Sequence, residues 1–309
     1  MTATPSNQVP KERLIESVAA ELCNPLPTRR TFFNYGWSAI AFALTGLALL
    51  PLLAILIEIL RQGLPRLKWE VFVSLPAAVG MQGVPNGFAN AIVGTLIMVA
   101  IASLISIPLG VMTGIFISEF GQGNTLANTV RFITTILTGV PSIIVGVFAY
   151  GVIVLNPITK GFSALAGAFA LSMIMLPIVA LSTEQALKLV PTSQRLASTA
   201  LGASRFQTTF RVVVAAAIPA MTTGILLAVA RAAGETAPLL FTALFSQNWS
   251  EGLLSPTASL SVLIYNYSVN SPDPEQNQLA WTASLVLVGL VLCISILSRL
   301  VTRKRLQTR

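Results

Sequence analysis

The sequence predicts an all-α polytopic membrane protein with six transmembrane helices. The chain of 309 residues is 54% hydrophobic and only 10% charged, whereas soluble domains carry about 25% charged residues. A bilayer requires about 20 apolar residues per helical span, and the chain offers six such stretches. Because lipid cannot satisfy free backbone groups, we expect each to be a helix. The stretches are 36–57, 88–118, 132–159, 161–183, 212 to about 245, and 279–298.

The distribution of Lys and Arg predicts the orientation of these spans. With the N-terminus inside, fourteen of the nineteen basic residues lie in inner segments and four lie in outer segments. Cytoplasmic loops are enriched in Lys and Arg, so we expect both termini in the cytoplasm. The basic residues are spread over separate segments, which argues against nucleic-acid binding. The four outer residues are Arg61, Arg66, Lys68 and Lys160.

The same patterns divide the chain into three parts. We expect a cytoplasmic N-terminal tail at 1–35, a six-span domain at 36–301 and a basic cytoplasmic tail at 302–309. The inner segment at about 184–211 has a helical composition interrupted by Pro191 and Gly202, which predicts two short helices with a turn at Gly202. The outer loop at about 246–278 is aromatic and polar, as in an in-plane helix or a docking surface.

Proline residues within the predicted spans allow two interpretations. Most are expected to be kinks that neighbouring helices tolerate. A broken helix that lines a polar path is favoured at two places, the stretch TGVPSIIVG (138–146) and Pro238. Pro238 follows two charged residues inside an otherwise apolar stretch.

Those two charges are Arg231 and Glu235, in the stretch RAAGETAPLL (231–240). Each costs about 2.5–3.5 kcal/mol at the centre of a membrane helix on insertion scales. One interpretation is an ion pair that only neutralises both groups. The other is that Arg231 faces a polar path and binds an anion through its fork of N–H donors. Glu235 would then hold Arg231 when the anion is absent, and Thr236 could add a hydroxyl donor.

Several classes of function are excluded or disfavoured by the composition. The chain has no His, which rules out imidazole metal sites, and we expect neither a metal nor a catalytic site. It lacks the G-x-x-x-x-G-K-[ST] phosphate-binding loop, so energy from ATP would have to come from another chain. A secondary transporter usually shows an internal repeat and membrane carboxylates. We see no repeat, and Glu235 is the one carboxylate deep in a predicted span.

Five stretches together resemble the PstA-type permease subunits of phosphate ABC importers. They occur in the order and spacing of that family, and the resemblance covers roughly residues 36–300. The GETAPLL portion is its most specific element. The stretches are NAIVGTLIM (90–98), IPLGV (107–111), GVPSIIVG (139–146), TEQALKLVP (183–191) and ARAAGETAPLL (230–240).

The inner segment also resembles the coupling motif of ABC importer permeases, with departures. Ala197 and Gly202 match the E-A-A-x-x-x-G pattern, whereas Leu196 stands in place of its Glu and Ser198 in place of its second Ala. An Arg that the family often carries near Leu181 is also missing. These departures leave Arg231 as the one candidate for an anion ligand within the spans.

The resemblance implies a MetI-like ABC importer permease fold and a role as half of a translocation pathway. The expected partners are a PstC-type sister permease, a PstB-type ATPase dimer that binds ATP and Mg²⁺, and a PstS-type phosphate-binding protein. The chain itself is expected to hold no cofactor, to lie in the bacterial inner membrane and to transport phosphate. The alternatives are an importer of another oxyanion and, more weakly, an ion-coupled secondary transporter. The residues implied for ATPase coupling are Ala197, Leu201, Gly202, Ala203 and Arg205; those implied for the substrate pathway are Arg231, Glu235 and Thr236.

Overall fold

The structure is a computed structural model that describes residues 28–78, 80–81, 84–121, 123–157 and 161–307. Contacts divide the chain into two units, Met1–Ile57 and Glu58–Arg309. In the first unit the described part is the helix α2 (Thr28–Gly63), whose last residues belong to the second unit. This helix begins before the apolar stretch at 36–57 that predicted it. The rest of the predicted N-terminal tail lies outside the described residues.

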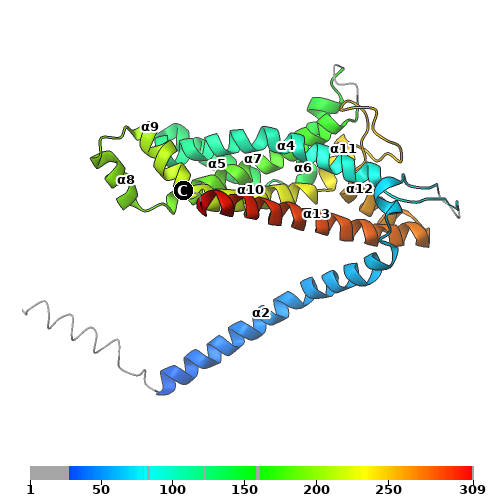
Figure 1. The fold of residues 1–309 in the computed structure, drawn as a ribbon, viewed down its shortest axis with the longest axis horizontal. Coiled ribbons are helices and arrows are strands. Elements are labelled where there is room, and N and C mark those ends of the chain that lie inside the picture. The colour runs from blue at the N-terminus through cyan, green and yellow to red at the C-terminus, as the bar shows by residue number, and fades with distance from the viewer. Residues whose placement is uncertain (1–27, 79, 82–83, 122, 158–160, 308–309) are drawn as a thin grey trace, which may run out of the picture. The chain divides into compact units, whose positions relative to one another are not determined.

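All regular elements in the described residues of the second unit are helices, joined by loops (Figure 1). Five helices, α2 among them, are long and apolar enough to cross a membrane. The bent pair α5–α6 gives a sixth span if it is counted as one. The prediction of an all-α, six-span protein is therefore confirmed. The elements are η1 (Leu64–Arg66), α3 (Glu70–Val73), α4 (Ala89–Ile115), η2 (Phe116–Phe120), α5 (Thr125–Gly139), α6 (Ser142–Ala149), η3 (Tyr150–Val154), α7 (Ala164–Lys188), α8 (Thr192–Ala200), α9 (Arg205–Gln207), η4 (Thr208–Val213), α10 (Val214–Ala233), α11 (Ala237–Thr242), α12 (Leu260–Tyr265), η5 (Asn266–Asn270) and α13 (Pro274–Gln307).

Helix α7 is the centre of the second unit, with α4 and α10 packed along it. Small residues allow this approach, as in other membrane bundles. A Cβ at Gly114 of α4 would lie 2.6 Å from the carbonyl oxygen of Ala180. A Cβ at Gly224 of α10 would lie 2.4 Å from the Ser182 side chain. The three helices therefore form one tightly packed body.

Three clusters of buried side chains continue this packing along the unit. One surrounds Met98, Leu171 and Met175, where α4 and α7 meet α11. A second joins Ile115 and Leu187 at the ends of α4 and α7 that lie near α8. The third lies at the opposite end and consists mainly of Val71, Phe88, Leu260, Leu263, Tyr267 and Leu279. Burial raises the pKa of Tyr267 to about 12.

The two stretches singled out for broken helices are the places where the helices end. Pro108, Pro177 and Pro219 each lie inside a continuous helix. In contrast, α5 ends at Gly139, Val140 is extended, and α6 starts after Pro141 at an angle of 103°. The residue before a proline disfavours the helical conformation. The stretch 132–159 is therefore two helices with a bend between them, as the interpretation of TGVPSIIVG as a broken helix predicts.

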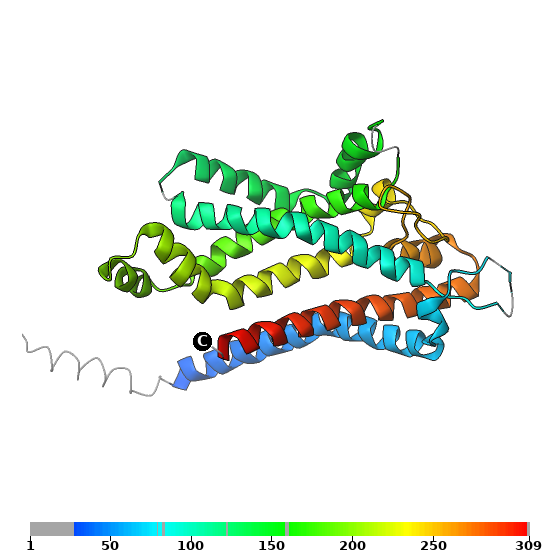
Figure 2. The same ribbon diagram turned by 45° about the horizontal axis from the view of Figure 1, so that its top comes forward.

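The inner segment forms the predicted helical hairpin, with different boundaries from those expected at 184–211. Helix α7 extends to Lys188, and α9 runs through η4 into α10 without a break. Between α8 and α9, Gly202 adopts φ +80, a conformation that costs glycine little. Figures 1 and 2 place α8 at one end of the unit and α12 at the other.

Candidate functional site

Arg231 and Glu235 form an ion pair where α10 ends. Arg231 lies in the last turn of the helix, where a cation is favoured by the helix dipole. The helix stops because Gly234 and Glu235 donate their N–H groups back to the carbonyls of Arg231 and Ala232, at 3.1 and 3.2 Å. Glu235 therefore stands just beyond the helix, not within it. The Arg231 Nε atom lies 3.3 Å from a Glu235 carboxylate oxygen.

The two partners differ in burial, which indicates which of them can meet a ligand. The Arg231 side chain is 49% exposed, whereas that of Glu235 is 13% exposed. Glu235 is also fixed through its backbone, since the Ser261 hydroxyl of α12 donates to the Glu235 carbonyl at 2.8 Å. The backbone at Glu235 is thus fixed, whereas the more exposed guanidinium can turn its remaining donors outward.

Arg231 lines a small cavity beside the break between α5 and α6. Its walls are mainly apolar side chains, together with the hydroxyl residues Thr138 and Ser142. Ser142 is the first residue of α6, and the free N–H groups of a helix start favour negative charge. Arg231 is the one charged residue among the described residues that line this cavity. The lining residues are Leu137, Thr138, Val140, Ser142, Val145, Ile174, Ile178 and Arg231.

The segment that follows Glu235 packs against the second half of the broken span. Helix α11 lies on α6 so closely that a Cβ at Gly146 would come within 2.7 Å of the Pro238 Cα. Thr236 is the residue just before α11; it is half-buried, and its side chain makes no capping hydrogen bond. Of the three residues expected in the pathway, Arg231 therefore lines the cavity and Glu235 pairs with Arg231. Thr236 does not line the cavity.

The residues expected to couple to an ATPase lie on the hairpin α8–α9. Ala197, Leu201 and Gly202 are exposed, and the Leu201 side chain is 89% exposed. Ala203 is half-buried. Arg205 is exposed as well, and its guanidinium also donates to the carbonyl of Glu119 and lies 5.6 Å from the centre of the Phe120 ring.

Two buried carboxylates at the same end of the unit were not predicted. Glu184 of α7 accepts from Arg131 Nε at 2.8 Å and from Lys188 Nζ at 2.6 Å. Glu119 of η2 pairs with Arg195 of α8. The sequence offered one signal, since Glu119 directly follows the uncharged stretch 88–118. In the sequence, their partners Arg131, Lys188 and Arg195 indicate only the orientation of the spans.

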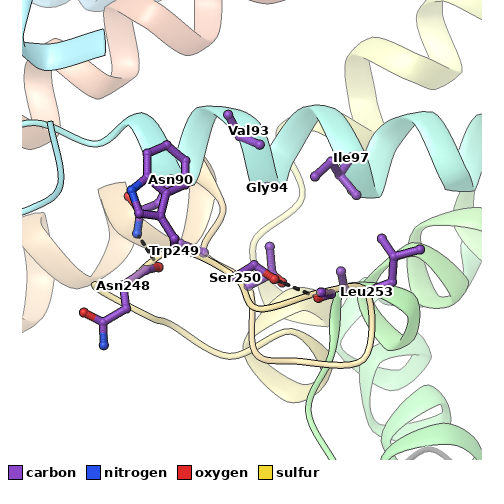
Figure 3. A pocket seen from close by; sticks show the side chains of 12 residues that line it. Asn90, Val93, Gly94, Ile97, Asn248, Trp249, Ser250 and Leu253 are labelled. Atoms are coloured by element: carbon purple, nitrogen blue, oxygen red, sulfur yellow. Dashed lines mark hydrogen bonds between the residues drawn. The ribbon is translucent and has the colours of Figure 1, made fainter. Parts of the chain in front are cut away.

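A larger cavity of about 160 Å³ lies near the opposite end of the unit, between the start of α4 and the loop that follows α11. Asn90 anchors this loop by donating to the carbonyls of Ser246 and Asn248, at 2.9 and 3.1 Å. Figure 3 shows the bond to Asn248. The other walls include Val93, Ile97 and Trp249. None of the described lining residues is charged, so this cavity lacks what an anion requires. A further cavity of about 290 Å³ is lined by Arg66 and Lys68 together with the carboxylates Glu70 and Glu275, so its charges balance each other. Arg231 and its surroundings are the candidate site because Arg231 lies deep in a predicted span.

Comparisons with known proteins show the family of this chain. The family described as "Binding-protein-dependent transport system inner membrane component" matches residues 106–307, which include both the hairpin and Arg231. The phosphate transport system permease protein PstA of Haemophilus influenzae is 40% identical over 80% of this chain and 85% of its own length. The PstA protein of Yersinia pestis is 40% identical over 82% and 84%. The chain belongs to the PstA-type permease family.

The fold of this PstA-type permease is that of ABC importer permeases. A chain of the inward-facing MetNI methionine ABC transporter matches it with a TM-score of 0.54 at 20% identity, over 70% of this chain and 92% of that one. The expected MetI-like fold is thus confirmed. With its long apolar helices, the PstA-type permease is a multi-pass inner-membrane protein.

Proposed function

We propose that this chain is the permease subunit of an ATP-driven importer of inorganic phosphate and that it forms half of the translocation pathway. The observation that carries the proposal is Arg231, half-exposed beside the cavity at the break between α5 and α6. Two PstA relatives at 40% identity, whose names refer to phosphate transport, support the choice of substrate.

The charged and polar groups at the site are those that a tetrahedral oxyanion needs once it has left water, and the cavity of about 10 Å³ would have to widen to admit it. Such an anion needs a positive partner, and the guanidinium offers two parallel donors and keeps its charge at any physiological pH. Ser142 and the start of α6 add polar groups on the same cavity. Glu235 holds Arg231 when phosphate is absent, which keeps the site from binding the anion too tightly to release it.

The energy and the delivery of the substrate come from other chains in this proposal. A PstB-type ATPase dimer binds ATP and Mg²⁺ and docks on the exposed hairpin, with Leu201 at its turn. A PstC-type sister permease completes the pathway, and a PstS-type binding protein brings phosphate from outside. Both termini of the chain then face the cytoplasm. The exposed, apolar tip of the hairpin supports a protein contact there.

The test is reconstitution of the chain with these three partners in lipid vesicles. We expect uptake of labelled phosphate that requires both ATP and the binding protein. Uptake driven by an ion gradient in the absence of ATP would instead establish a secondary transporter.

Competition experiments identify the substrate. Excess unlabelled phosphate is expected to abolish uptake, whereas molybdate and sulfate leave it unchanged. If molybdate or sulfate is taken up in preference to phosphate, the chain serves another oxyanion importer.

A further inference from the structure

Both arms of the exposed hairpin are attached to a single residue of the packed body. On the α8 arm, Arg195 pairs through one guanidinium nitrogen with the Glu119 carboxylate. On the α9 arm, Arg205 donates to the backbone carbonyl of the same Glu119 and lies over the neighbouring Phe120 ring. The turn at Gly202 lies between these two arms.

The attachment is well satisfied and largely shielded from water. The Glu119 side chain is 7% exposed, and its second oxygen accepts from the Ser118 hydroxyl at 2.9 Å. The second guanidinium nitrogen of Arg195 donates to the Leu187 carbonyl at 2.8 Å. Arg195 therefore connects the hairpin to the ends of both α4 and α7. A charge-assisted pair that is nearly buried holds its geometry better than an exposed one.

The arms are also braced against each other, and the turn is left free. The hydroxyls of Ser198 and Thr208 lie 2.9 Å apart across the hairpin. In contrast, the side chains of Leu196, Leu201 and Phe206 are each more than 60% exposed. The hairpin thus presents an apolar surface while its base is fixed.

The helices that receive this attachment lead to Arg231. Helices α4 and α7 pack at Gly114, and α10, which carries Arg231, packs on α7 at Gly224. Energetic coupling between distant sites is carried by packed side chains, hydrogen-bond networks and rigid helices that can adopt two discrete arrangements. A displacement of a hairpin fixed to Glu119 reaches α4 and α7, whereas a displacement of a loose hairpin is absorbed in the loop.

We propose that Glu119 and Arg195 are positioning residues that convert movement of a docked ATPase into movement of the pore helices. This inference rests on the proposed function for its source of movement. The chain offers a matched control in Glu184, whose side chain is 4% exposed and is paired with two cations, neither of which lies on α8 or α9. Glu184→Gln removes a buried charge of the same kind without touching the hairpin.

The first experiment measures how firmly the hairpin is held. A nitroxide label is placed at Leu201→Cys in the full-length chain in lipid vesicles, after Cys23 and Cys293 are changed to Ser. We expect spectra of higher label mobility in Glu119→Gln and in Arg195→Gln, and an unchanged spectrum in Glu184→Gln. Equal mobility in all variants would overturn the attachment, and this result does not depend on the transported substrate.

The second experiment measures coupling in the assembled importer. We expect Glu119→Gln to lower phosphate uptake per ATP hydrolysed by at least tenfold, with ATP hydrolysis within twofold of the parent and Glu184→Gln near the parent ratio. The reversed pair Glu119→Arg with Arg195→Glu should recover part of the ratio. An unchanged ratio in Glu119→Gln would overturn the coupling role. A parent complex that takes up no phosphate would instead contradict the proposed function and leave the mobility result to decide the attachment.

Discussion

At the scale of single residues, the surroundings of Arg231 give a reason for a charge within a predicted span. Arg231 is half-exposed and stands beside polar groups at a helix break, while Glu235 is nearly buried and held by Ser261. If the two residues served only to neutralise each other's charge, the Arg231 guanidinium would not need to line a cavity. Apolar residues of similar volume often replace a buried ion pair without loss of stability.

Substitution of Arg231 tests its role as anion ligand. Arg231→Lys keeps the charge but loses the fork of donors, so we expect phosphate uptake to fall about tenfold. Arg231→Gln loses the charge as well, and we expect uptake to fall by about a hundredfold or more. Uptake is normalised to assembled complex. The control is Arg61→Gln, which removes an exposed Arg paired with Glu58. Normal uptake by Arg231→Gln would show that Arg231 and Glu235 only neutralise each other's charge.

Substitution of Glu235 tests release. Glu235→Gln leaves the guanidinium without its counter-charge, and we expect phosphate to bind more tightly and leave more slowly. The apparent KM and the maximal rate of uptake should therefore fall together, by about tenfold. A rise in KM with an unchanged maximal rate would show that Glu235 assists binding instead.

At the scale of elements, the function depends on where helices end. Helix α5 breaks before α6, and α10 breaks before α11, and the two short helices after the breaks pack against each other. Arg231 is the last charged residue before one break and lines the cavity at the other. At the opposite functional surface, the turn of the hairpin depends on one glycine in the left-handed region.

The contact between α6 and α11 can be tested through Gly146. A Cβ there would meet the Pro238 backbone at 2.7 Å, and overpacking of this kind costs about 1–3 kcal/mol. We expect Gly146→Val to lower both the thermal stability and the phosphate uptake of the complex. Gly151→Val is the matched control, since nothing lies within 4 Å of a Cβ at Gly151. Equal behaviour of the two variants would exclude a special role for the contact.

The hairpin can be tested through Gly202. Its φ of +80 strains a β-branched residue, while nothing lies within 4 Å of an added Cβ. We expect Gly202→Val to insert normally and to lose most ATP-driven uptake, because the turn no longer presents Leu201 correctly. The control is Gly80→Val, at φ +86 and also in open space. Normal uptake by Gly202→Val would show that Gly202 is not the coupling turn.

At the scale of the whole molecule, the distribution of charge and the number of spans together predict one topology. With the bent pair counted as one span, six spans would place both termini on the same side, and the excess of Lys and Arg predicts that this side is the cytoplasm. The hairpin and the loop after α11 lie at opposite ends of the second unit (Figures 1 and 2). One end thus suits an ATPase and the other a binding protein.

Labelling in intact cells tests this topology. In a chain without native Cys, Leu201→Cys is expected to react with a membrane-impermeant maleimide only after the membrane is opened. Trp249→Cys, at a side chain that is 49% exposed, is expected to react in intact cells. A reporter fused after Arg309 should read as cytoplasmic, and a periplasmic signal there would contradict the six-span topology.

The sequence by itself determined the features that depend on local chemistry. Uncharged stretches of bilayer length have to be helices in lipid. Pro141 and Pro238 could be singled out, and Gly202 could be identified as a turn, because backbone preferences act over a few residues. The motif around Glu235 was sufficient to indicate the PstA-type family, which the relatives confirm.

Only the tertiary structure decided which distant groups meet. Glu119 and Arg195 are 76 positions apart, and Arg131 and Glu184 are 53 apart; no local pattern specifies such pairs. Pro108 and Pro141 both lie in apolar stretches, yet the first stays within α4, where α7 packs along the helix, and the second lies at the break between α5 and α6. Arg205, which the resemblance assigns to the contact with an ATPase, also has a carbonyl and an aromatic ring as partners within the chain, and both belong to residues more than 80 positions away. The partners of these charged residues are set by how the helices pack, because packing brings residues that are distant in the sequence into contact.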